Sequence, residues 1–140
     1  MLIMNVDRLR EVCLSFPCAT EQIQWGNDLV FKVGGKMFAV TPLEPASVSL
    51  SFKASPENFA ELTERPNIIP APYLARAQWV ALQARDALPA EELARLLRES
   101  YDLVFAKLPK KTRDVLTRAK YSARNARRKK FVKKKPKRSR

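Results

Sequence analysis

The spacing of hydrophobic residues between positions 29 and 52 predicts three β-strands. Alternate positions are apolar in 29–33, 37–41 and 47–52, as in strands that bury one face. Gly34-Gly35 separates the first two runs and predicts a tight hairpin, because two-residue turns require positive φ angles. In the third run, Val48, Leu50 and Phe52 are expected to face the core. These runs predict an antiparallel meander, to which 22–25 and 78–83 add two further strands.

Other segments have helical spacing. Asn5 is a suitable cap for a first helix that ends at Pro17, and Ser55-Pro56 begins a second that stops near residue 65. Pro89 opens the longest helix, and a short helix follows over 111–118. The apolar stripe of the longest helix consists of Leu93, Leu96, Leu97, Tyr101, Val104 and Leu108. Prolines at 66, 70 and 72 argue against regular structure before Tyr73. The order of elements predicts an α+β fold, with an antiparallel sheet and helices packed on one face.

Charge divides this chain into two parts. Residues 107–140 contain 17 Lys and Arg against one acid, a net charge of +16, whereas residues 1–106 contain 10 Lys and Arg against 13 Asp and Glu, a net charge of −3. A dense cationic segment with few apolar residues gains little from folding alone and much from a polyanion. We therefore expect a folded domain over residues 1–118 and a basic C-terminal arm over 119–140, disordered or partly helical.

The residues that usually carry enzyme chemistry are scarce. The chain has no histidine, and its three glycines, at 26, 34 and 35, exclude a phosphate-binding loop of the Walker or dinucleotide type. The carboxylates do not form a general acid/base pair, and no base accompanies Ser100. We expect a protein that is not an enzyme, with no catalytic residues, no metal site and no cofactor.

Cys13 and Cys18 have neither the spacing of a zinc site nor that of a redox pair, and a reducing cytoplasm suits two free thiols. The first residues lack the basic region and apolar stretch of a secretory signal, and no apolar run reaches the ~18 residues of a membrane span. The expected location is the cytoplasm, in association with the nucleoid.

The basic arm and the segment before it supply the candidate nucleic-acid-binding residues. They are Lys110, Lys111, Arg118, Lys120, Arg124, Arg127, Arg128, Lys129, Lys130, Lys133, Lys134, Lys135, Lys137 and Arg138. Such side chains bind phosphates without reading bases, so the expected partner is DNA of any sequence. RNA is an alternative partner, because phosphate contacts barely distinguish the two. Membrane binding is not expected, since the arm has almost no apolar face.

A set of short motifs between about residues 5 and 116 resembles the MmcQ/YjbR family of small bacterial proteins. The motifs are Phe16-Pro17, Trp25-Gly26, Phe31-Lys32-Val33-Gly34-Gly35-Lys36-Met37-Phe38, Pro70-Ala71-Pro72-Tyr73-Leu74-Ala75, Trp79-Val80, Ser100-Tyr101-Asp102-Leu103-Val104 and Leu108-Pro109-Lys110. The resemblance implies a CyaY-like fold and a DNA-binding role inferred from similarity to double-wing DNA binders. It implies no catalytic residues. The basic arm departs from the family pattern, in which the chain ends soon after its last helix.

Trp25 and Tyr73 are the candidates for lining a surface groove, which would hold a base, a peptide or a small ligand. The leading interpretation is a sequence-tolerant DNA-binding protein whose arm supplies the affinity. The alternative is a module that binds a protein or a small ligand through the Trp25 and Tyr73 region.

Overall fold

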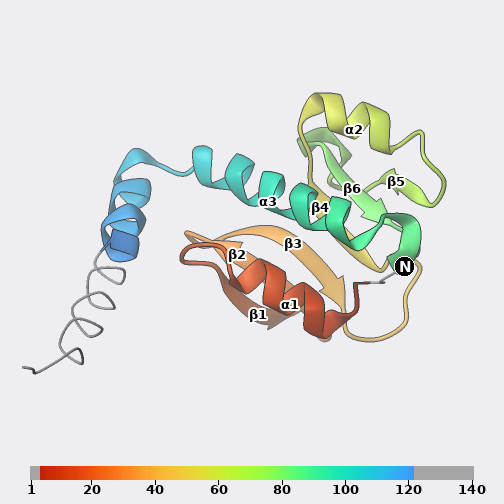
Figure 1. Cartoon of the computed structure of the whole chain (residues 1–140), viewed down its shortest axis with the longest axis horizontal. Helices are drawn as coiled ribbons and strands as arrows, with labels where there is room; N and C mark the ends of the chain where they lie inside the picture. Colours follow the sequence, from red (N-terminus) through yellow and green to blue (C-terminus); the bar gives the residue numbers. More distant parts are fainter. Residues whose placement is uncertain (1–3, 122–140) are drawn as a thin grey trace, which may run out of the picture.

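The computed structural model describes residues 4–121, which form one antiparallel six-stranded sheet with helices packed against it (Figure 1). The elements are α1 (Val6–Leu14), β1 (Thr20–Gln24), β2 (Asp28–Val33), β3 (Lys36–Pro42), β4 (Leu50–Lys53), α2 (Pro56–Leu62), β5 (Ile68–Pro70), the 3₁₀ turn η1 (Ala75–Ala77), β6 (Trp79–Leu82), the 3₁₀ turn η2 (Arg85–Ala87) and α3 (Ala90–Ala106). Residues 110–121 are also helical. The strand order is β1-β2-β3-β4-β6-β5. The predicted α+β fold is confirmed.

Local sequence signals set the element boundaries that were predicted. The Asn5 side chain accepts the backbone N–H of Arg8 at 2.8 Å and caps α1, and Ser55 caps α2 in the same way through Asn58. Gly34 and Gly35 both have positive φ and join β2 to β3, with Val33 paired to Lys36. The hairpin therefore has the two-residue turn that these glycines predict.

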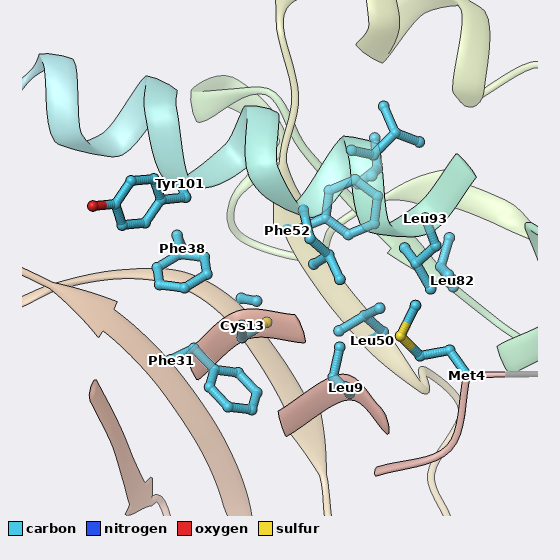
Figure 2. Close-up of a cluster of buried hydrophobic side chains, with 14 of the residues drawn as sticks. Met4, Leu9, Cys13, Phe31, Phe38, Leu50, Phe52, Leu82, Leu93 and Tyr101 are labelled. Atoms are coloured by element: carbon cyan, nitrogen blue, oxygen red, sulfur yellow. The ribbon is translucent and has the colours of Figure 1, made fainter. Parts of the chain in front are cut away.

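The main core lies between the sheet and the helices α1 and α3 (Figure 2). Phe31, Phe38 and Phe52 come from neighbouring strands and are fully buried there, with Leu9 of α1 and Leu97 of α3. We call this the covered face of the sheet and the opposite side the open face.

A smaller apolar cluster lies on the open face. Trp79 and Ala81 of β6 are buried there with Ala71, while Val80 and Leu82 of the same strand point into the main core. This division of β6 agrees with the alternation in its sequence.

A bulge in β3 interrupts the pairing with β2. The register shifts between Phe31, opposite Ala39, and Lys32, opposite Met37, so that Phe38 is the extra residue. Phe38 thereby points into the core, where its ring lies 5.5 Å from that of Tyr101, edge to face.

Two predictions about strands were wrong. β4 begins at Leu50. The Ser49 N–H donates to the Leu82 carbonyl and the Thr41 hydroxyl donates to the Ser49 carbonyl, so Ser49 makes no ladder bond with β3. Val48 accordingly packs against the open-face cluster, not the main core.

The second error concerns β5, which was not expected because of its prolines. β5 is an edge strand that pairs with β6 alone, and Pro70 is its last residue. An edge position tolerates proline because the missing N–H removes no bond from a central ladder.

Helical structure over 110–121 crosses the expected domain boundary at 118/119, which stays a prediction. Within residues 4–121, no helix combines the length and the apolar character needed to cross a bilayer.

Candidate nucleic-acid interface

The helix over 110–121 is attached to the rest of the fold at its first two turns. Leu108, just before it, is buried, and a side chain at Gly34 would come within 2.6 Å of its Cδ1 and 3.3 Å of the Thr112 Cγ2. Leu116 packs against the main core, and the Cys18 thiol lies 3.6 Å from the Leu116 carbonyl oxygen. The hairpin turn and the α1–β1 loop thus hold the segment that leads into the basic arm (Figure 1).

The four predicted binding residues on this helix have different surroundings. Lys111 and Arg118 are exposed and, seven residues apart, share one side of the helix. Lys110 forms a 3.0 Å ion pair with Asp114 at an exposed position. Lys120 lines a hollow of about 220 Å³ between the helix and α3, beside Arg98 and Asp102. Lys111 and Arg118 are therefore the most available for phosphate.

The other predicted binding residues lie outside the described residues. They are Arg124, Arg127, Arg128, Lys129, Lys130, Lys133, Lys134, Lys135, Lys137 and Arg138. Their assignment stays a prediction from sequence.

The strand register gathers four further lysines at one end of the sheet, which we call the basic end. Lys36 is exposed beside the Gly34-Gly35 turn, and Lys107 is exposed just before the buried Leu108 that touches the turn. Lys32 and Lys53 occupy open-face positions near the same ends of β2 and β4, paired with Met37 and Trp79 respectively. These four lysines come from three separate segments of the chain, so no sequence pattern groups them.

Lys53 ties the loop after β5 to the basic end. Its ammonium group donates to the Ala77 carbonyl, which belongs to η1. Burial lowers the pKa of Lys53, and the nearby charge of Lys107 lowers it further.

Most of the acidic residues are on the helices. Eight of them are on α1, α2 and α3, namely Asp7, Glu11, Glu57, Glu61, Glu91, Glu92, Glu99 and Asp102. The described strands carry two acids: Glu21 of β1 forms an ion pair with Arg10 of α1, and Asp28 of β2 pairs with Pro42 at the end of the sheet away from the Gly34 turn. The net charge of −3 over residues 1–106 is therefore unevenly distributed, with lysines at the basic end of the sheet and most of the acids on the helices.

Trp25 and Tyr73 do not line one groove. Trp25 is in the turn between β1 and β2, at one edge of the sheet, and Tyr73 follows β5, at the other edge, so β3, β4 and β6 lie between them. Trp25, 64% exposed, lines a hollow of about 420 Å³ with Asp28, Glu44 and Pro45. Tyr73 is fully exposed on the loop that η1 and Lys53 hold beside the basic end.

Ser100, which sequence alone left without a role, is structural. Its hydroxyl is fully buried, donates to the Phe38 carbonyl at 2.6 Å and accepts the Lys53 N–H at 3.0 Å. Within residues 4–121, no three His, Cys, Asp or Glu side chains are grouped as a metal site would require.

Comparison with known proteins places this fold in a family. The sequence matches the YjbR family over residues 14–103. It is 37% identical to protein DR2400 of Deinococcus radiodurans, a crystal structure of a DUF419 domain, with a TM-score of 0.72 over 81% of this chain and 88% of that one. A Pseudomonas syringae protein of known structure shares the fold at 21% identity, with a TM-score of 0.58 over 71% of this chain and 98% of that one. No curated protein matches the sequence. The chain belongs to the YjbR family, as its motifs predicted.

Proposed function

We propose that this protein is not an enzyme and binds DNA without sequence preference, through the Lys/Arg-rich segment that follows α3. The observation that carries the proposal is the net charge of +16 over residues 107–140. Phosphate contacts from Lys and Arg release condensed counterions and supply affinity that does not depend on base sequence.

The fold supports this role by giving the arm a fixed origin. The 110–121 helix is held by Leu108, Thr112 and Leu116, so the arm starts from a defined place beside the Gly34 turn. Lys111 and Arg118 on that helix extend the cationic surface back to the domain. The domain orients the ligand, and the arm provides most of the binding free energy. We also propose a cytoplasmic location, near the nucleoid, because two free cysteines suit a reducing compartment.

The test is the salt dependence of binding to a duplex of arbitrary sequence. If about 8 charges meet phosphates, log K should fall with log salt with a slope of about −7. Replacing Lys133, Lys134 and Lys135 with Gln in the full chain should reduce that slope by about 3. An unchanged slope and affinity, or no binding to duplex or single-stranded DNA at low salt, would overturn the proposal. Competition with RNA decides whether DNA is preferred.

A second candidate function rests on Trp25. Its hollow joins an exposed indole to the carboxylates of Asp28 and Glu44, a combination that suits a basic peptide side chain. Such binding would be saturable and would be lost in Trp25→Ala, whereas DNA binding by the arm would not change in that variant.

A further inference from the structure

The Tyr73 side chain is presented in an unusual way for an aromatic residue. It is fully exposed, and its backbone is left-handed, with φ of +66°. A bulky residue rarely adopts this conformation, and here the side chain gains no burial in return. Backbone strain of this kind clusters at functional sites.

The loop that carries Tyr73 is held firmly. The Ala71 N–H donates to the Trp79 carbonyl, the Trp79 N–H donates to the Leu74 carbonyl, and Leu74 packs on the open-face cluster. Lys53 adds its bond to the Ala77 carbonyl. The loop therefore holds the Tyr73 backbone in one position, which reduces the conformational entropy lost when a partner stacks on the phenol ring.

Two cationic residues belong to the elements that hold the Tyr73 loop. Arg76, three residues later, is exposed on η1, and the Lys53 ammonium group donates to the Ala77 carbonyl of the same turn. An exposed aromatic ring on a loop with nearby cations suits a nucleotide, whose base stacks on the ring while its phosphates meet the cations. In a duplex the base faces are already stacked on one another, whereas those of an unpaired strand are free.

We propose that the basic end, Lys32, Lys36, Lys53 and Lys107, is a second nucleic-acid contact surface that takes an unpaired strand, with one base stacked on Tyr73. The inference rests on the proposed function and adds a preference to it. The arm binds any phosphate backbone, and the domain distinguishes unpaired from paired strands. The Gly34 turn and the 110–121 helix lie together at one end of the molecule (Figure 1), and Lys36 and Lys107 are next to them in the chain, so one strand can contact the arm and the basic end.

The test compares binding of the full chain to a fluorescent 20-nucleotide oligothymidine and to a 20-base-pair duplex. Tyr73→Ala should weaken binding to the single strand about tenfold and change duplex binding less than about twofold. Tyr73→Phe, which keeps the ring, should bind like the parent chain. Tyr73 packs on nothing, so these variants should fold, which circular dichroism checks.

The lysines are tested by a matched pair of double variants. Lys36→Gln with Lys107→Gln should flatten the salt slope on the single strand by about 1.4. Arg8→Gln with Arg95→Gln removes the same charge from exposed positions on α1 and α3 and should leave the slope unchanged.

The two proposals fail in different ways. A chain that binds neither ligand at low salt removes the proposed function altogether. A chain that binds both, with Tyr73→Ala equal to the parent on the single strand, overturns the stacking site and leaves the arm intact. Equal loss on both ligands in Tyr73→Ala also overturns it, because stacking on a free base would not affect the duplex.

Discussion

The Ser100 hydroxyl donates a 2.6 Å hydrogen bond to the Phe38 carbonyl across the interface of α3 with the sheet. The same oxygen accepts the Lys53 N–H, so one side chain bridges β3 and β4 beyond their last paired residues, Ala39 and Phe52. The bulge at Phe38 opens this gap, and the hydroxyl satisfies two backbone groups that would otherwise be buried without a partner.

Ser100→Ala should therefore lower the free energy of unfolding by about 1–3 kcal/mol, because it leaves those two groups unsatisfied. Urea unfolding followed by circular dichroism measures the loss. Ser51→Ala, at an open-face position of β4, is the matched control and should change stability by less than about 0.5 kcal/mol. An equal loss of stability in Ser100→Ala and Ser51→Ala would show that the Ser100 hydrogen bonds do not stabilise the fold.

The two glycines of the hairpin turn should respond differently to alanine. Both have positive φ, so each substitution costs about 1 kcal/mol of backbone strain. At Gly35 the added methyl meets nothing within 4 Å, but at Gly34 it comes within 2.6 Å of Leu108. Gly34→Ala should cost about 1 kcal/mol more than Gly35→Ala, since Leu108 must move out of a packed site.

Limited proteolysis gives this comparison a second measurement. Displacement of Leu108 should loosen the 110–121 helix, so Gly34→Ala should be cut faster there than Gly35→Ala. Equal rates of cutting would show that the turn does not hold the helix.

The ion pair between Arg65 and Glu92 should make the free energy of unfolding depend on pH in the acidic range. Both guanidinium NH groups reach the carboxylate, at 2.8 and 3.0 Å, and this hydrogen bonding lowers the pKa of Glu92 below its ordinary value of 4.5. The stabilisation is present above pH 4.5 and is lost as the pH falls through the lower folded value.

Glu92→Gln should thus destabilise the protein at pH 7 by about 1 kcal/mol, a figure reduced for the partial exposure of the pair. The difference from the parent should shrink as the pH falls through the lowered pKa of Glu92, because the parent then loses the pair as well. Glu64→Gln, on the exposed turn after α2, should show neither effect in urea titrations over this pH range.

The two thiols should react with a maleimide reagent at different stages, Cys18 before Cys13. Cys13 is fully buried in the main core, and burial raises the pKa of its thiol, whereas Cys18 is partly exposed beside the 110–121 helix. A maleimide reagent followed by mass spectrometry should modify Cys18 in the native protein and Cys13 only on unfolding. Leu116→Ala should speed the reaction of Cys18, and an unchanged rate would show that the helix does not shield it.

Local signals predicted more of this fold than did long-range ones. The Gly34-Gly35 turn and the caps at Asn5 and Ser55 each follow from neighbouring residues, and all three formed as expected. β5 was missed because proline is tolerated only where a strand is at an edge, and the sequence does not show which strand that is.

The candidate site was less predictable, for a related reason. Trp25 and Tyr73 both precede or follow strands, but the strand order puts them at opposite edges. Lys32 and Lys53 lie toward the same end of the sheet only through the register of β2 and β4, and Lys107 follows the end of α3 there. Grouping of this kind depends on tertiary structure. The arm is a continuous run of cations and is visible in the sequence, whereas the basic end is not.

The close approach of Gly34 to Leu108 also limits how this architecture can be rebuilt. Residues 108–140 are not a portable tag, because their first turn rests on a hairpin that has room for no side chain at that position. Transplanted onto a homologue with a bulkier or longer hairpin, the same cations would leave the scaffold at another angle. The homologue would gain the positive charge of the segment without its position relative to the domain.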